Sequence, residues 1–484
     1  MALLCVGVVA CGQKSASQPE RKDAGVARDA APVVMEITPR PLGLPQLTAF
    51  DWRKRDGQPM FRIARKAEQR GDWEAVAEQC REALAADPGN LDAAWLFAIA
   101  LAKLGKYDEL VAPLQLAVSG EFIKWGAASL DHEALQPFRA TPRGQAWRRR
   151  VEQDHSLYLA ALARSVIISA GGDLFAYDPE QTRWHRLTRS YGAVLAGLSV
   201  TSAHQIAYVT RSKTPGKRQL ALGVVDLVRP KTTRPVDLGT DGPAFIAFSS
   251  ATPSGFWVGS GTPRPTNKTT WRRLAADDGK LVALPAKSTR PGGPWLEITG
   301  TIARRHGLPL PALSADWDDQ GLASALRIPS SNRVVSVPSP GLIDGNTLAW
   351  SPDRSHLAFV ADLDEECRVG IAGTAVYVAD TATGSATLVH TAPVAPDKLD
   401  DGLAIQWIGD RSLAVADRDG VAVIDIAANT PTPLAGATGL VTPRYRARCT
   451  AAQREPVIAG PSDPADDDDG DLARPVDAGV EVHR

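Results

Sequence analysis

Two hydrophobic periodicities divide the chain. From Met60 to about Gln153, apolar residues recur at the three- and four-residue spacing of an amphipathic helix. From about Ala163 the spacing changes to two, and turn-forming residues recur roughly every 8–12 positions. The pattern predicts a helical segment followed by a longer β-rich segment.

The helical segment contains an internal repeat with an offset of 34 residues. Its glycines allow tight turns, its aromatic residues fill the space between helices, and its alanines permit close helix approach. The matched pairs are Phe61 with Trp95, Ala64 with Ala98, Gly71 with Gly105, Trp73 with Tyr107, and Ala83 with Ala117. Asp87-Pro88 is predicted to end the first repeat, and a degenerate third unit follows at 130–139. The segment resembles the tetratricopeptide repeat, which implies two antiparallel helices per repeat.

The β-rich segment contains successive sets of short strands. Strands are predicted at 165–169, 173–177, 184–187, 194–200, 204–210, 220–227, 234–238, 244–248, 255–259, 270–274, 280–284, 296–302, 321–327 and 333–337. The clearest set, 345–391, contains Leu348-Ala-Trp-Ser-Pro-Asp353, and Ile405-Gln-Trp-Ile-Gly-Asp410 repeats this pattern in the last set, 403–435. Val378-Ala-Asp380 has a similar counterpart in Val423-Ile-Asp425.

These sets resemble the blades of TolB-like and WD-type β-propellers, in which LAWSPDG joins two inner strands. The resemblance implies a C-terminal propeller in which each blade is a four-stranded sheet. Arg354 stands where that family prefers Gly, a residue that tolerates positive φ. Six blades fit the strand sets best, and seven remain an alternative. If the run Thr438–Tyr445 supplies the strand that the first set lacks, both ends of the domain close the ring. The predicted fold class is therefore multidomain and mainly β.

The N-terminal residues suggest export. Ala2–Ala10 is too short to cross a membrane as a helix and fits the apolar region of a signal peptide. Val8-Val9-Ala10-Cys11 resembles the bacterial lipobox, which implies that Cys11 carries lipid and anchors the chain to a membrane. No Lys or Arg precedes the apolar run, which a start codon further upstream would explain. Gly12, rather than Asp, implies by the same resemblance the outer membrane, facing the periplasm.

The expected domains are a signal peptide and lipobox at 1–11, a disordered tether at 12–49, helical repeats at 50–158, the propeller at 163–460 and an acidic disordered tail at 461–484. Pro32, Pro39, Pro41 and Pro45 exclude a continuous helix in the tether. A net charge of −1 does not favour binding to nucleic acid. The charged residues are, however, unevenly distributed along the chain. The tail contains eight acidic and two basic residues, a local charge of −6, and the remaining chain is therefore near +5. The tail has too few apolar residues to fold alone.

No catalytic, metal-binding or cofactor-binding motif stands out. HExxH, GxSxG, P-loop and CxxC patterns are absent from the sequence, and the eight histidines are scattered singly. Cys80 is expected to be a buried free thiol. Cys367 and Cys449 form a disulfide in an oxidising periplasm if their geometry permits, and are otherwise free.

Two charged loops are candidate partner-binding surfaces on one rim of the predicted propeller. The basic loop contains Arg211, Lys213, Lys217 and Arg218, and the acidic loop contains Asp362, Asp364, Glu365 and Glu366. The acidic loop lacks the residue order of a calcium loop. The alternative is that both loops are simply solvated charge.

The leading functional hypothesis is a non-catalytic, lipid-anchored envelope protein that binds protein partners through its repeats and its propeller. Two alternatives remain open. One is a propeller enzyme, a hydrolase or lyase that acts on glycans or peptides. The other is a sensor whose propeller binds a small ligand.

Overall fold

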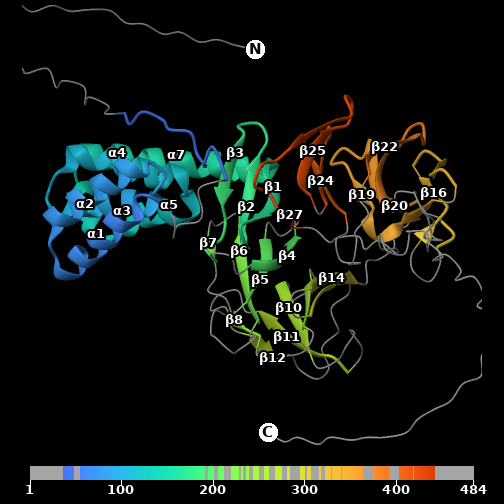
Figure 1. The fold of residues 1–484 in the computed structure, drawn as a ribbon, viewed down its shortest axis with the longest axis horizontal. Helices are drawn as coiled ribbons and strands as arrows, with labels where there is room; N and C mark the ends of the chain where they lie inside the picture. The colour runs from blue at the N-terminus through green and yellow to red at the C-terminus, as the bar shows by residue number, and fades with distance from the viewer. Residues whose placement is uncertain are drawn as a thin grey trace, which may run out of the picture.

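A computed structural model describes most of the chain between residues 36 and 441. The described residues are 36–47, 55–190, 194–200, 205–211, 220–227, 231–232, 236–238, 244–249, 255–260, 268–274, 281–283, 295–299, 302–306, 315–317, 322–328, 330–339, 341–363, 374–391, 403–417 and 419–441. Helices form one end of the molecule and antiparallel sheets form the rest (Figure 1).

The helical part consists of consecutive packed helices. They are α1 (Gln58–Arg70), α2 (Trp73–Ala86), α3 (Leu91–Lys103), α4 (Tyr107–Gly120), α5 (Phe122–Asp131), the 3-10 helix η1 (Glu133–Leu135), α6 (Gln136–Arg139) and α7 (Pro142–Arg164). Each of α1 to α4 packs against the next helix in the chain. The predicted helix pairs are confirmed, because α2 and α4 begin at the two matched aromatic residues, Trp73 and Tyr107.

Local sequence explains where these helices start and stop. Gly71 and Gly105 adopt φ of +74° and +71°, the left-handed conformation that ends a helix at low cost for glycine. The side chains of Asp72 and Asn90 accept hydrogen bonds from the backbone N–H of Ala75 and Ala93, which caps α2 and α3. The repeat therefore specifies its own turns.

The third unit is shorter than a full helix pair. The predicted stretch 130–139 forms the end of α5, the single turn η1 and the four-residue α6. Phe138 and Trp147 are buried between these elements and the long α7, which covers the end of the array. Trp147 Nε1 donates to Ser129 Oγ at 3.3 Å.

The described strands form five larger antiparallel sheets and one two-stranded hairpin. The first sheet contains β1 (Val166–Ala170), β2 (Asp173–Asp178), β3 (Arg183–Arg186) and β27 (Gly439–Leu440), and the second contains β4 (Val194–Val200), β5 (Gln205–Arg211), β6 (Leu220–Asp226), β7 (Lys231–Thr232) and β8 (Val236–Asp237). The third contains β9 (Ala244–Ser249), β10 (Gly255–Ser260), β11 (Thr270–Leu274), β12 (Leu281–Ala283), β13 (Trp295–Thr299) and β14 (Ile302–His306). The fourth contains β15 (Leu322–Ala323), β18 (Leu342–Asp344), β19 (Ala349–Trp350), β20 (His356–Asp362), β21 (Thr374–Asp380) and β22 (Ala386–Thr391), and the fifth contains β23 (Ala404–Ile408), β24 (Ser412–Asp417), β25 (Gly420–Asp425) and β26 (Thr430–Pro433). The hairpin is β16 (Ala325–Ile328) with β17 (Arg333–Ser336).

The predicted closing strand is confirmed. Strand β27 pairs with β1, with Leu440 opposite Ile168 and Gly439 opposite Ser169. The backbone N–H of Thr438 also donates to the carbonyl oxygen of Ser169 at 2.9 Å. The end of the β-rich segment therefore completes the sheet with which it begins.

Most sheets that are consecutive in the chain pack against each other, but no cluster of described residues joins the third sheet to the fourth. Shared hydrophobic clusters join the first sheet to the second, the second to the third, the fourth to the fifth and the fifth back to the first. The related turns of the fourth and fifth sheets also touch. Trp407 Nε1 donates to the carbonyl oxygen of Ala349 at 2.8 Å, and the backbone N–H of Asp353 donates to Asp410 Oδ1 at 2.9 Å.

One part of the strand prediction was wrong. Residues 296–337 were expected to form a set of their own, the sixth blade. Instead β13 pairs with β9 and, together with β14, extends the third sheet, and β15 joins the fourth. Strands β16 and β17 pair with each other and pack on the fourth sheet through a shared hydrophobic cluster. The described strands of this region therefore form no four-stranded sheet of their own. Strands β13 and β15 make their backbone hydrogen bonds to strands of the third and fourth sheets instead.

The predicted tether was also wrong at its C-terminal end. Residues 36–47 form an ordered strap that passes from the helices to the first sheet (Figure 1). Leu42 and Leu47 are buried, and the backbone of Leu44 exchanges hydrogen bonds with Trp184 at 2.7 and 2.9 Å. Arg183 Nε and Nη2 donate to the carbonyl oxygens of Leu42 and Gly43. Contacts with residues far away in the sequence hold the strap in place, since its own sequence has no helical or strand periodicity.

The helices and the first sheets share one continuous core. Trp95, Tyr158, Leu174, Ile206 and Val441 belong to the same buried cluster, although they come from helices and from strands of two sheets. None of the described helices is both long enough and apolar enough to span a bilayer.

Candidate functional site

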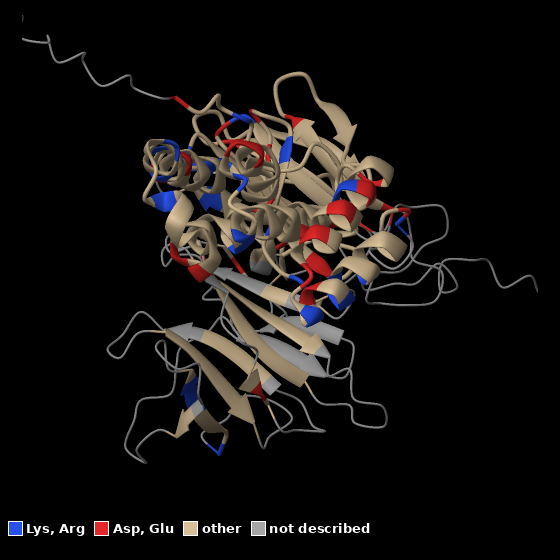
Figure 2. Ribbon diagram, turned by 90° about the vertical axis from the view of Figure 1, so that its left-hand side faces the viewer, with Lys and Arg blue, Asp and Glu red and all other residues tan. Residues whose placement is uncertain are grey.

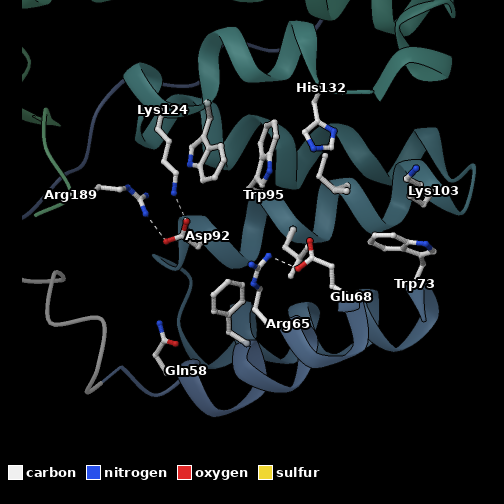
Figure 3. A pocket seen from close by; sticks show the side chains of 14 residues that line it. Gln58, Arg65, Glu68, Trp73, Asp92, Trp95, Lys103, Lys124, His132 and Arg189 are labelled. Carbon is white, nitrogen blue, oxygen red and sulfur yellow. Dashed lines mark hydrogen bonds and ion pairs between the residues drawn. The ribbon is translucent and has the colours of Figure 1, made fainter. Parts of the chain in front are cut away.

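A groove of about 640 Å³ runs along the helical part. Helices α1, α3 and α5 supply most of its lining, so it follows the first helix of each unit (Figure 3). The lining residues are Gln58, Phe61, Arg65, Glu68, Trp73, Asp92, Trp95, Leu96, Ile99, Lys103, Lys124, Trp125, His132 and Arg189. The repeat produces this surface because residues at equivalent positions, such as Phe61 and Trp95, face the same side.

The floor of the groove is apolar and aromatic. Leu96 and Ile99 are each 4% exposed, and the rings of Trp95 and Trp125 stack at 4.4 Å between centroids with an angle of 15° between planes. His132 meets Trp95 edge-on at 5.7 Å. The Lys124 ammonium lies 4.0 Å from the centre of the Trp125 ring, which is a cation–π contact.

One end of the groove contains a buried ion network. Asp92 Oδ1 accepts from Lys124 Nζ at 2.7 Å, and its Oδ2 accepts from Arg189 Nη1 at 2.7 Å (Figure 3). Arg189 also forms a two-point ion pair with Glu121, whose side chain is only 3% exposed. Arg189 lies just after β3, so this network ties the helices to the first sheet.

Burial and neighbouring charges shift the pKa values of these groups. Burial acts to raise the pKa of Asp92, but Arg189 and Lys124 outweigh it, and the net pKa is lowered. Burial and the neighbouring Arg189 lower the pKa of Lys124 despite its contact with Asp92. The carboxylate thus stays charged, and Lys124 gains from any further anionic contact.

One group in the lining leaves binding capacity open. Lys103, at the end of the groove opposite Asp92, is exposed and pairs with no carboxylate in the described part of the chain. Of the lining carboxylates, Glu68 pairs with Arg65 and Asp92 with two cations. The Nε1–H of Trp125 has no hydrogen-bond acceptor among the described residues, but this atom is buried. The groove therefore offers aromatic surface and an ammonium group without a described counter-ion.

The acidic loop prediction needs correction at Asp362. This residue is the last of β20, pairs with Thr374 of β21 and is 1% exposed, so the strand extends further than its sequence suggested. Its carboxylate therefore does not face a partner. Asp364, Glu365, Glu366 and Cys367 lie outside the described residues.

The other sequence-predicted positions are mostly outside the described part. Arg211 ends β5, whereas Lys213, Lys217, Arg218, Cys11 and Cys449 fall outside the described residues. Cys80 is confirmed as a buried free thiol on α2, and burial raises its pKa to about 12. Within the described ranges, no three His, Cys, Asp or Glu residues gather as a metal site would require.

Sequence reasoning predicted binding through a concave groove of the repeats but did not identify the residues that line it. The repeat gave one usable signal, since Phe61 and Trp95 were matched and both line it. Residues one or two helical turns further along the same helix faces would have added Arg65, Ile99 and Lys103. Arg189 gives no such signal, because it lies 97 residues from Asp92.

No protein family model matches the chain, and no curated protein is similar to it. Several solved structures are similar at low identity. TolB from Acinetobacter baumannii is 12% identical over 57% of this chain and 64% of that chain, with a TM-score of 0.30. The tricorn protease is 11% identical over 58% and 27%, with a TM-score of 0.30. A 6-phosphogluconolactonase-like protein from Bacteroides uniformis is 13% identical over 58% and 97%, with a TM-score of 0.31. The aligned region covers less than two thirds of the TolB chain, and similarities at this level say nothing about ligand or activity.

Proposed function

We propose that this protein is a non-catalytic scaffold of the bacterial envelope that binds a polypeptide partner in the groove of its helices. The groove carries this proposal. It combines a buried aromatic floor with the exposed basic groups of Arg65 and Lys103. Trp and Arg dominate the binding energy of protein interfaces, and helical repeat arrays present extended concave surfaces to their ligands.

The helical part is proposed to be a tetratricopeptide-like array. Helix pairs recur at the predicted offset, and α7 closes the array on the side of the sheets. We propose that the sheets form an irregular TolB-like propeller. Four shared clusters between neighbouring sheets and the β27–β1 pairing support it. The second candidate binding surface is the rim that carries the charged loops.

The groove proposal is tested by site-specific photo-crosslinking in the native envelope. A photo-reactive amino acid at Arg65, inside the groove, is expected to capture a discrete polypeptide. The same amino acid at Arg149 is the control, because Arg149 is an exposed residue of α7 outside the groove. Equal capture at both positions, or capture at neither, contradicts the proposal.

Membrane anchoring is proposed to occur through lipid on Cys11. Metabolic labelling with a fatty-acid analogue is expected to mark the chain expressed from the upstream start, and Cys11→Ser should abolish the label. An unlabelled, soluble wild type would overturn the anchoring and leave the groove proposal untouched.

A further inference from the structure

The groove and the end of the chain carry complementary charge. Four basic and two acidic side chains line the groove, and the buried Glu121 is paired with one of the basic groups, Arg189, so the excess is one positive charge without counting His132. Segment 461–484 carries eight acidic and two basic residues, and the remaining chain is near +5. We propose that this acidic segment of the same chain occupies the groove until a partner displaces it. The inference rests on the proposed polypeptide-binding role of the groove.

The groove suits this segment better than other basic surfaces do. Basic and acidic residues are both scattered over the helices in the view of Figure 2. The exposed Arg149 of α7 lies outside the groove and its apolar floor. In the groove, Lys103 is free to pair at one end, and Lys124 gains from a further anion at the other.

The segment matches the apolar floor as well. Leu472 and Val476 follow the run Asp466–Asp469 closely, so acidic and apolar side chains can engage the groove together. A site that recognised charge alone would not need the apolar side chains.

The chain is long enough to reach. The described part ends at Val441, which belongs to the same buried cluster as Trp95 and Trp125. Residues 442–460 span up to roughly 60 Å when extended, whereas α3 along the groove is about 20 Å long. Tethering on this scale gives an effective concentration near the millimolar range, so a weak self-contact is sufficient.

The first test is intramolecular photo-crosslinking in the full chain. A photo-reactive amino acid at Ala473 is expected to crosslink to α1, α3 or α5, with a yield independent of protein concentration. Lys103→Glu should reduce this yield several-fold, and Arg149→Glu, an equal change of charge outside the groove, should not. Crosslinks to α7 or to the sheets, or no crosslink, would overturn the proposal. Crosslinks only between two copies would also do so.

The second test measures how accessible the groove is. A fluorescent synthetic peptide of residues 461–484 is titrated into the full chain and into a full chain with Asp466–Asp469 changed to Asn. The neutralised chain is expected to bind the peptide about tenfold more tightly, because its own segment no longer competes. Equal affinity for both chains rejects self-occupancy. The proposed function fails separately, if position 65 captures no partner even in the neutralised chain.

Discussion

At the scale of single residues, His185 shows how the junction depends on an uncharged imidazole. It is 3% exposed, its ring meets Tyr158 edge-on at 5.3 Å, and its Nε2 has no hydrogen-bond partner among the described residues. Burial lowers its pKa from 6.5 to about 4. A charged ring there would lack water, and the attraction of Asp178 is opposed by Arg183 and Arg164.

The pKa of His185 predicts an acid-sensitive fold. His185 binds a proton near pH 6.5 in the unfolded chain and only near pH 4 in the folded chain. Its contribution to the free energy of unfolding is therefore fully present above about pH 6.5 and is lost as the pH falls from there to about 4. The loss approaches about 3 kcal/mol by pH 4. Urea unfolding of wild type and His185→Gln across this range measures it. The variant should show a shallower slope, whereas equal slopes would mean that other groups cause the loss.

Arg354 occupies a position that glycine would fit better. Its φ is +60°, the left-handed conformation in which the propeller family's turn carries Gly. This conformation costs a non-glycine residue roughly 1–2 kcal/mol. Glycine removes that cost, but it also makes the unfolded chain more flexible, which offsets part of the gain in stability. Arg354→Gly should therefore raise the free energy of unfolding by about 0.5 kcal/mol, and Arg354→Val should lower it. A destabilised glycine variant would show that the Arg354 side chain contributes more than its backbone costs.

At the scale of elements, the local sequence decided how well each part could be predicted. Strands β4 and β11 match their predicted bounds, because turn-forming residues lie close to both ends of each strand. Residues 295–337 could not be assigned correctly, since a short apolar strand does not specify which sheet edge it joins. The strap at 36–47 has no period at all, and only its contacts with Trp184 and Arg183 order it.

Two glycines of the helical part, Gly105 and Gly120, allow backbone strain and side-chain crowding to be compared. A Cβ at Gly105 would meet no atom within 4 Å, so Gly105→Ala is penalised through its φ of +71° alone, by about 1 kcal/mol. Gly120→Ala places its Cβ 2.7 Å from Leu91 Cδ2 and tests crowding without positive φ. Asn tolerates the left-handed conformation, so Gly105→Asn should recover part of the loss. Thermal unfolding of the three variants separates strain from crowding. If Gly105→Asn is no better than alanine, backbone conformation is not the cause.

At the scale of the whole molecule, four contacts make the helices and the sheets one unit. They are the continuous core, the strap, the two-point ion pair of Arg164 with Asp178, and the network of Arg189. The chain is thus not two independent modules on a linker. Arg189 lines the groove and belongs to the segment after β3, so an occupant of the groove would contact a residue that is tied to the first sheet.

Arg189 provides the sharpest test of this coupling. Arg189→Ala leaves Glu121 buried without its cation and removes one partner of Asp92, and such losses cost about 3 kcal/mol. Arg189→Lys restores charge but not the two-point geometry, so it should recover only part of that loss. The control Arg65→Ala breaks an exposed pair with Glu68 and should cost less than about 0.5 kcal/mol.

Urea unfolding is followed by circular dichroism at the helix minimum and by tryptophan fluorescence. Coincident transitions in wild type and an earlier helical transition in Arg189→Ala are expected, because the variant loses a link between the two parts. If the variant still unfolds in one transition with unchanged stability, the shared core and the strap alone hold the molecule together, and Arg189 serves only the groove.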